Sequence, residues 1–106
     1  MATYLLNAPV LTNFGWYRFK EISIYEAKEI LEEGYTSAVG HQSTADILSK
    51  LLHMNIEVNR INSRQEVGDK SVVFWLLQRQ PEGVVVQTVE EIEKIGYTFG
   101  LILRET

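Results

Sequence analysis

The chain has 106 residues with 45% hydrophobic and 23% charged side chains, a balance that predicts one globular domain spanning residues 1–106. Its ten basic and fourteen acidic residues give a net charge of −4, which argues against duplex DNA or RNA as a partner because counterion displacement needs a basic surface. The absence of cysteine excludes disulfides and thiolate metal sites. With no apolar run long enough for a bilayer and no signal-peptide pattern, we expect a cytoplasmic protein without a membrane partner.

The first third of the chain predicts two strands and a helix. Residues 3–6 read as a strand that ends before Pro9, which cannot donate to a ladder. Residues 16–22 carry their larger apolar side chains mainly on alternate positions, as in a second strand. The segment Ser23-Ile24-Tyr25-Glu26 matches a capping box and predicts a helix that ends at Gly34.

The middle of the chain predicts a short strand followed by an amphipathic helix. Residues 35–39 form the strand, and the apolar positions within residues 47–52 lie on one helix face, which suits packing against a sheet. Residues 56–58 and 61–67 are less regular, and we interpret them as edge strands before a turn at Gly68-Asp69.

The last third predicts a buried strand, a helix and a final strand. Residues 72–77 are all apolar, which is typical of a central strand. A second capping box at residues 88–91 opens a helix that stops at Gly96, and residues 97–103 form the last strand. Strands and helices alternate, so we expect an α/β domain with a mixed β-sheet and helices packed against it.

The candidate site is the run Gly40-His41-Gln42-Ser43-Thr44 at the start of the second helix. A helix start offers unpaired backbone N–H groups and a partial positive charge, so it can hold an anion. The imidazole of His41 can transfer a proton near neutral pH. Alternatively, His41 is a surface histidine in a strand-to-helix turn, and Ser43 or Thr44 is the N-cap residue of the helix.

Metal catalysis and a serine triad are not supported by the pattern. His41 and His53, the two histidines of the chain, are separated by a helix, so no metal or other cofactor is expected. His53, near the end of that helix, is interpreted as a cation favoured by the helix C-terminus. Ser43 lies too near His41 in sequence for a Ser-His-acid triad.

These motifs, with others along the chain, resemble the viral type III anti-CRISPR ring nucleases and their cellular relatives. The shared elements, which occur in the same order and at similar spacing, are Leu6-Asn7-Ala8, Gly40 to Thr44, Asn59-Arg60, Gly68-Asp69, Arg79 and Glu82-Gly83. The resemblance covers almost the whole chain. It implies a homodimer that binds cyclic tetra-adenylate, the second messenger of type III CRISPR effectors, and cleaves it without a metal to linear di-adenylate with 2′,3′-cyclic phosphate ends.

The resemblance also implies roles for individual residues. His41 matches the catalytic histidine, Ser43 matches a phosphate-contacting serine, and Arg79 and Glu82 match charged residues at the ligand site. We therefore expect His41 and Glu82 to be catalytic, and the ligand to be bound by residues Asn7, Gly40, Ser43, Thr44 and Arg79.

Arg79 and Glu82 also have structural interpretations, as a strand-end residue paired with a carboxylate and as a turn residue. The chain departs from the viral pattern at Val10, where a relative has serine, and at Trp75, where it has glutamine. Two rival functions remain open, a non-catalytic module that sequesters the cyclic nucleotide and a dimeric interaction protein without a nucleotide ligand.

Overall fold

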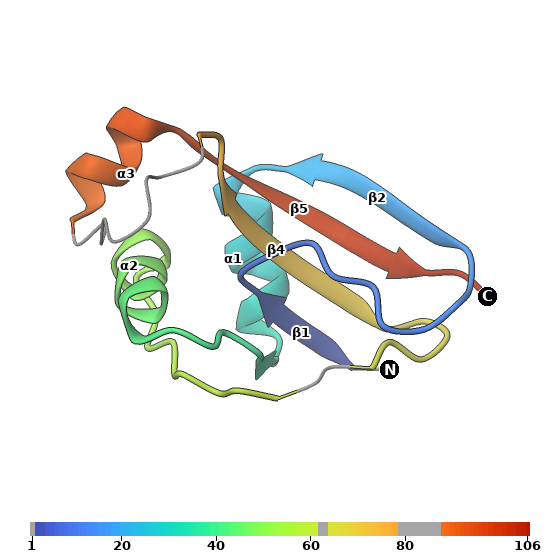
Figure 1. The fold of residues 1–106 in the computed structure, drawn as a ribbon. Coiled ribbons are helices and arrows are strands. Elements are labelled where there is room, and N and C mark those ends of the chain that lie inside the picture. The colour runs from blue at the N-terminus through green and yellow to red at the C-terminus, as the bar shows by residue number, and fades with distance from the viewer. Residues whose placement is uncertain (1, 62–63, 79–87) are drawn as a thin grey trace.

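The computed structural model describes residues 2–61, 64–78 and 88–106, which form a five-stranded mixed sheet and three helices (Figure 1). This confirms the predicted α/β fold with a mixed sheet. The strands are β1 (Thr3–Leu6), β2 (Tyr17–Ile22), β3 (Thr36–Ser37), β4 (Lys70–Leu76) and β5 (Tyr97–Arg104). The helices are α1 (Ile24–Glu32), α2 (Gln42–Leu52) and α3 (Val89–Ile95).

The sheet has the order β2-β5-β4-β1-β3, so the apolar strand β4 lies at its centre as predicted. β1 runs parallel to both of its neighbours, β3 and β4, whereas β5 runs antiparallel to β4 and to β2. In register, Leu5 lies between Ser37 of β3 and Val72 of β4. Because β3, β1 and β4 are parallel neighbours, the segments that follow them leave the same edge of the sheet.

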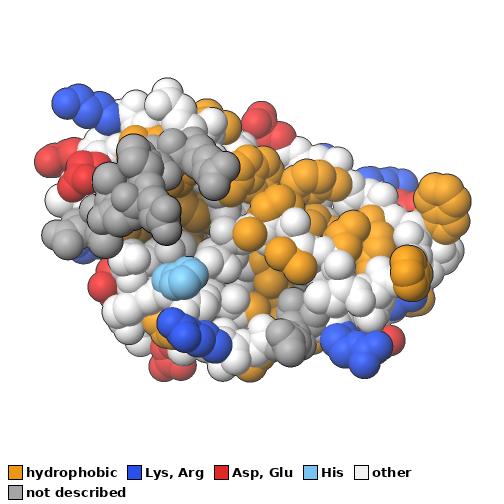
Figure 2. Space-filling view, viewed as in Figure 1, with side chains coloured by type: hydrophobic (Ala, Val, Ile, Leu, Met, Phe, Trp, Pro, Cys, Tyr) orange, Lys and Arg blue, Asp and Glu red, His pale blue; other side chains and the backbone are white. Residues whose placement is uncertain are grey.

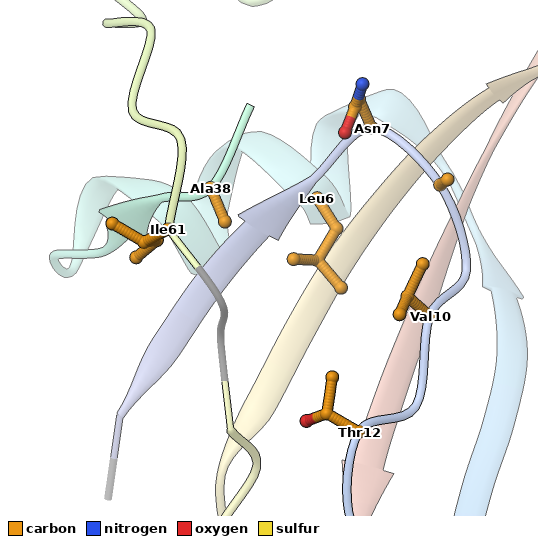
Figure 3. Close-up of a pocket in the computed structure, with 7 residues that line it drawn as sticks. Leu6, Asn7, Val10, Thr12, Ala38 and Ile61 are labelled. Carbon is orange, nitrogen blue, oxygen red and sulfur yellow. The ribbon is translucent and has the colours of Figure 1, made fainter. Parts of the chain in front are cut away.

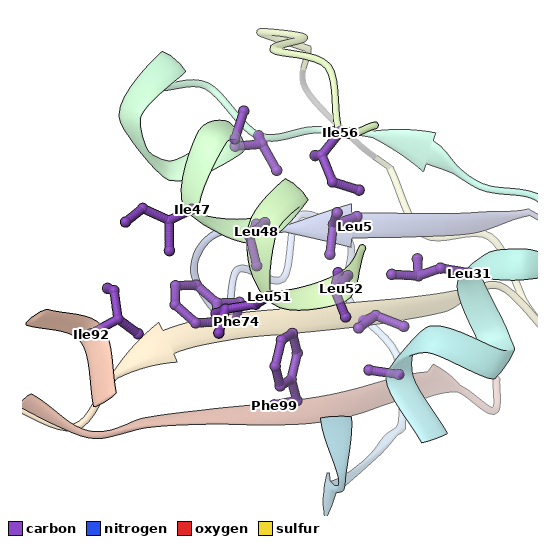
Figure 4. Packing of buried hydrophobic residues seen from close by; sticks show 14 of the residues in the cluster. Leu5, Leu31, Ile47, Leu48, Leu51, Leu52, Ile56, Phe74, Ile92 and Phe99 are labelled. Carbon is purple, nitrogen blue, oxygen red and sulfur yellow. The ribbon is translucent and has the colours of Figure 1, made fainter. Parts of the chain in front are cut away.

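The main core lies between one face of the sheet and the helices (Figure 4). The apolar face predicted for α2 is confirmed, and its buried residues are Ala45, Ile47, Leu48, Leu51 and Leu52. Leu5, Phe74 and Phe99 meet them from three adjacent strands. Among the described helices, none has the length and apolar character that a bilayer crossing requires.

Local signals set the boundaries of α1 and α3. Ser23 and Glu26 form the predicted reciprocal capping box, in which the Glu26 N–H donates to Ser23 Oγ at 3.1 Å. Thr88 caps α3 by accepting from the Glu91 N–H at 3.1 Å. α1 gives way to Gly34, whose φ of 119° lies in a region that side chains rarely adopt. These ends agree with the prediction.

The edge strands predicted at residues 56–58 and 61–67 are wrong wherever the structure describes them. The first segment is held to β3 by side-chain hydrogen bonds and not by a backbone ladder. Ser37 Oγ donates to the Glu57 carbonyl at 2.6 Å, and Asn59 Nδ2 donates to the Ser37 carbonyl at 2.8 Å. In the segment 61–67, the side chain of Gln65 forms hydrogen bonds with Val10 and Thr12. The turn predicted at Gly68-Asp69 is confirmed, with the Asp69 N–H donating to the Glu66 carbonyl.

The other face of the sheet carries a second apolar cluster. It is built on Leu6, Val73 and Ile102, with Tyr17 and Trp75 packed beside them. No helix in the described part of the chain covers this face, and the β1–β2 connection crosses it (Figure 1). Figure 2 shows hydrophobic side chains gathered over it, with a histidine and a basic side chain exposed nearby.

Candidate functional site

The candidate site lies at the sheet edge where β1 and β3 both end. Asn7 follows β1 directly, and Gly40 and His41 follow β3 after a short extension. The Ala38 N–H donates to the Leu5 carbonyl at 2.9 Å, so the two strand ends remain side by side. Carboxyl ends of neighbouring parallel strands are a common place for ligands in α/β folds.

His41 is the N-cap residue of α2. Its backbone is extended (φ −129°, ψ 132°), and its carbonyl accepts the first helical bond from the Ala45 N–H at 3.0 Å. The alternative prediction, that Ser43 or Thr44 caps the helix, is wrong, because both residues already lie within the first turn. Their backbone N–H groups, with that of Gln42, therefore belong to the open end of the helix.

The N-terminus of α2 is left open toward solvent. No side chain among the described residues caps it, whereas Ser23 and Thr88 cap the other two helices. The first turn of α2 also contains no acidic residue, while those of α1 and α3 do. His41 and Ser43 are exposed there. In the described ranges the imidazole of His41 forms no hydrogen bond.

Arg60 braces the segment that leads to His41. Its Nε donates to the Gly40 carbonyl at 2.7 Å, which holds the guanidinium next to the helix start. The preceding Asn59 is tied to the segment between β3 and α2 through its backbone N–H, which donates to the Val39 carbonyl at 2.8 Å. The pair Asn59-Arg60 thus places a positive charge beside the candidate anion site. A Cβ on Gly40 would lie 3.6 Å from Arg60 Cγ, so sterics do not require glycine there.

An open hollow of about 190 Å³ lies beside the same strand ends (Figure 3). Its lining residues are Leu6, Asn7, Ala8, Val10, Thr12, Ala38 and Ile61. In Figure 3, Leu6 lies between Ala38 and Ile61 on one side and Val10 and Thr12 on the other, and the Asn7 amide points away from Leu6. The lining is therefore mostly apolar, and its polar side chains are Asn7 and Thr12.

Most of this lining was not predicted as part of a site. Thr12 and Ile61 belong to none of the motifs recognised in the sequence. They meet at the hollow because the β1–β2 connection folds back over the sheet. Val10, which stands where a viral relative has serine, is 48% exposed and forms part of the wall. A sequence offers no signal for such a contact between distant loops.

Two predicted site residues, Arg79 and Glu82, lie outside the described residues. The chain reaches Leu77 and Gln78 at the carboxyl end of β4, immediately before Arg79 in sequence. Trp75 projects to the helix-free face, where its ring lies 5.8 Å from that of Phe19.

Two further groups lie away from the helix start. His53 is at the opposite end of α2, as its C-cap residue, with a left-handed φ of 52°. Tyr35 precedes β3, and burial and then Glu57 raise the pKa of its hydroxyl. Within the described ranges no three His, Cys, Asp or Glu side chains lie together as metal ligands.

Comparisons with known proteins agree on one family. A family model described as STIV B116-like matches residues 3–99. Uncharacterized protein 26 of Sulfolobus islandicus filamentous virus is 47% identical over 83 residues, covering 77% of this chain and 70% of that protein. Uncharacterized protein YddF of Bacillus subtilis is 38% identical over 98% of both chains. B116 of Sulfolobus turreted icosahedral virus has the same fold, with a TM-score of 0.80 and 21% identity over 98% of this chain and all of B116.

Proposed function

Because this chain belongs to the STIV B116-like family, the family of the viral ring nuclease, we propose that it cleaves cyclic tetra-adenylate without a metal. The products are linear di-adenylates with 2′,3′-cyclic phosphate ends, and their formation switches off type III CRISPR signalling. The observation that carries the proposal is the position of His41. This residue is exposed and is the N-cap residue of α2, but its side chain makes no capping hydrogen bond, and it lies at the sheet edge where β1 and β3 end.

The open first turn of α2 supports binding of a phosphodiester. Its unpaired N–H groups and partial positive charge attract an anion, and neither a capping side chain nor an acidic residue of that turn competes. The Ser43 hydroxyl adds a donor, and Arg60 places a guanidinium beside Gly40. These donors stabilise the charge that develops on the phosphorus oxygens.

His41 then acts as the general acid. The 2′-oxygen of a ribose attacks the neighbouring phosphorus, the bond from phosphorus to the 5′-oxygen breaks, and the imidazolium protonates that leaving oxygen. Water takes the proton of the 2′-hydroxyl, and a 2′,3′-cyclic phosphate remains. In the proposal Arg79 clamps the ligand and Glu82 acts beside it, both assigned through the family resemblance.

A homodimer is part of the proposal, since two copies of His41 address opposite bonds of one symmetric ring. The helix-free face of the sheet is the surface we assign to the second copy. Phe19 is 52% exposed there and packs against Trp75, and both rings cross over Gly100, where a Cβ would lie 2.6 Å from Phe19 Cε1. Val10 and Ile61, which line the hollow, are exposed apolar side chains as well.

The test of the proposed function is incubation of labelled cyclic tetra-adenylate with the protein in EDTA. Sustained release of di-adenylate with a cyclic phosphate end supports the ring nuclease. Intact ligand retained on the protein would instead support the non-catalytic module that sequesters the cyclic nucleotide. If no cyclic oligoadenylate is cut or raises the melting temperature, the interaction protein is the better account, because a bound ligand must stabilise the folded state.

Phe19→Asp is expected to yield a monomer at concentrations where the wild type is dimeric. A charge placed in an apolar interface remains unpaired and desolvated when two copies meet. Sedimentation velocity measures the change. The control is Tyr25→Asp, on α1, where the side chain is 79% exposed and lies on the helical side of the molecule. A dimer that persists in Phe19→Asp but not in Tyr25→Asp would place the interface elsewhere.

A further inference from the structure

The segment between β1 and β2 depends on side chains for its position. Residues 7–11 and 13–15 of this segment form no backbone–backbone hydrogen bond with another described residue, yet Val10 and Thr12 make one wall of the hollow. A loop of this length without such bonds would sample many conformations. Something outside the loop must therefore hold the wall in place.

Gln65 supplies much of that restraint. It is fully buried, and both ends of its amide bond to the loop. Gln65 Oε1 accepts from the Thr12 hydroxyl at 3.1 Å and from the Thr12 N–H at 3.5 Å, while Nε2 donates to the Val10 carbonyl at 3.2 Å. A buried amide costs free energy unless it is bonded, so this arrangement favours one loop position.

The backbone of Gln65 and its neighbours extend the restraint along the loop. Asn13 Nδ2 donates to the Gln65 carbonyl at 2.8 Å, and Arg64 donates through Nε and Nη2 to Asn13 Oδ1. Arg104 donates through Nη1 to the same Gln65 carbonyl and through Nη2 to the Phe14 carbonyl. Gln65 thus lies at the centre of the bonds that join loop, sheet and hollow.

We infer that Gln65 is a positioning residue for the ligand site, one that holds the Val10–Thr12 wall without touching the ligand. This inference rests on the proposed function. Gln65 bonds to the loop and is not among the residues that line the hollow, whereas His41, the proposed general acid, lies at the start of α2. Loss of the Gln65 bonds should therefore weaken binding of the ring and leave the chemical step unchanged.

The test is steady-state cleavage of cyclic tetra-adenylate by Gln65→Met, which keeps the length of the side chain and removes its hydrogen bonds. We expect KM to rise about tenfold, the size of one or two net hydrogen bonds, with kcat unchanged. Hydrogen exchange in a peptide spanning residues 7–16 should accelerate, while a peptide from α1 should not change. Asn13→Ala, which removes the bonds of the Asn13 side chain to the Gln65 carbonyl and to Arg64 but keeps the buried Gln65 amide, should act in the same direction by a smaller factor.

Each contrary outcome has a separate meaning. A merely structural role for Gln65 lowers the folded fraction, so the apparent kcat falls while KM is unchanged, and this result overturns the inference. Unaltered exchange in residues 7–16 overturns it whatever the activity, and Asn13→Ala supplies both readouts if Gln65→Met does not fold. Tyr35→Phe, which removes a hydroxyl bond to the Asn55 carbonyl away from the loop, should leave both unchanged. A wild type that neither binds nor cuts the ring overturns the proposed function and this inference together.

Discussion

His41→Ala is expected to lower kcat for ring cleavage by about 10²–10⁴, the usual contribution of one well-placed proton donor. The 5′-oxygen then leaves without a proton, while the first-turn N–H groups of α2 remain to hold the phosphate. The fold should persist, since His41 makes no side-chain capping bond that alanine would remove. Single-turnover cleavage and ligand binding, measured on the same preparation, separate the chemical step from affinity.

The matched control is the histidine at the other end of the same helix. His53 occupies a left-handed C-cap position, so we choose His53→Asn, because asparagine adopts that conformation more readily than alanine. Its kcat and affinity should equal those of the wild type. Equal losses in both variants would indicate damage to α2, and full activity in His41→Ala would assign the proton transfer to another group.

Replacing the attacking hydroxyl is expected to have the second large effect. A cyclic tetra-adenylate with 2′-deoxyribose at all positions lacks the nucleophile, so cleavage should fall below detection. Its phosphates still meet the N-terminus of α2 and the guanidinium of Arg60, and the dissociation constant should remain within about tenfold of the ribose ring. Product analysis by mass spectrometry and a competition binding assay measure the two quantities.

The intermediate case sharpens this experiment. A ring with two opposite 2′-deoxy positions retains two intact ribose nucleophiles, so it should be cut only at the phosphates that follow them. Cleavage of the fully deoxy ring at a rate comparable to that of the ribose ring would contradict the transesterification mechanism, because water would then be the nucleophile. The products of that reaction would lack cyclic phosphate ends.

Elements with local signals could be predicted well from the sequence. The capping box at Ser23, the buried run in β4 and the apolar face of α2 all gave correct elements, because each depends on residues a few positions apart. The failures came where partners are distant. Residues 61–67 were interpreted as an edge strand, yet the Gln65 side chain bonds to a loop more than fifty positions earlier.

The candidate site was predicted only in part. The motif at Gly40 to Thr44 identified a helix start with a histidine, but the choice of N-cap residue depends on backbone angles, and these put His41 there and not a hydroxyl residue. Asn7 was selected through family resemblance, and the parallel pairing of β1 with β3 puts the segments that carry Asn7 and His41 at the same edge of the sheet. The apolar hollow and its restraint by Gln65 had no counterpart in the sequence.

The amino-acid sequence by itself determined the helices, the central strand and the chemical groups at the start of α2. Periodicity and caps are short-range properties, and each can be recognised in a window of a few residues. Only the tertiary structure decided which strands are neighbours, which sheet face the three described helices cover and which loops border the hollow. Those features depend on pairing between distant segments, such as Leu5 with Ser37 and Val72 or Gln65 with Val10, and the free energy of such contacts exists only once the chain has folded.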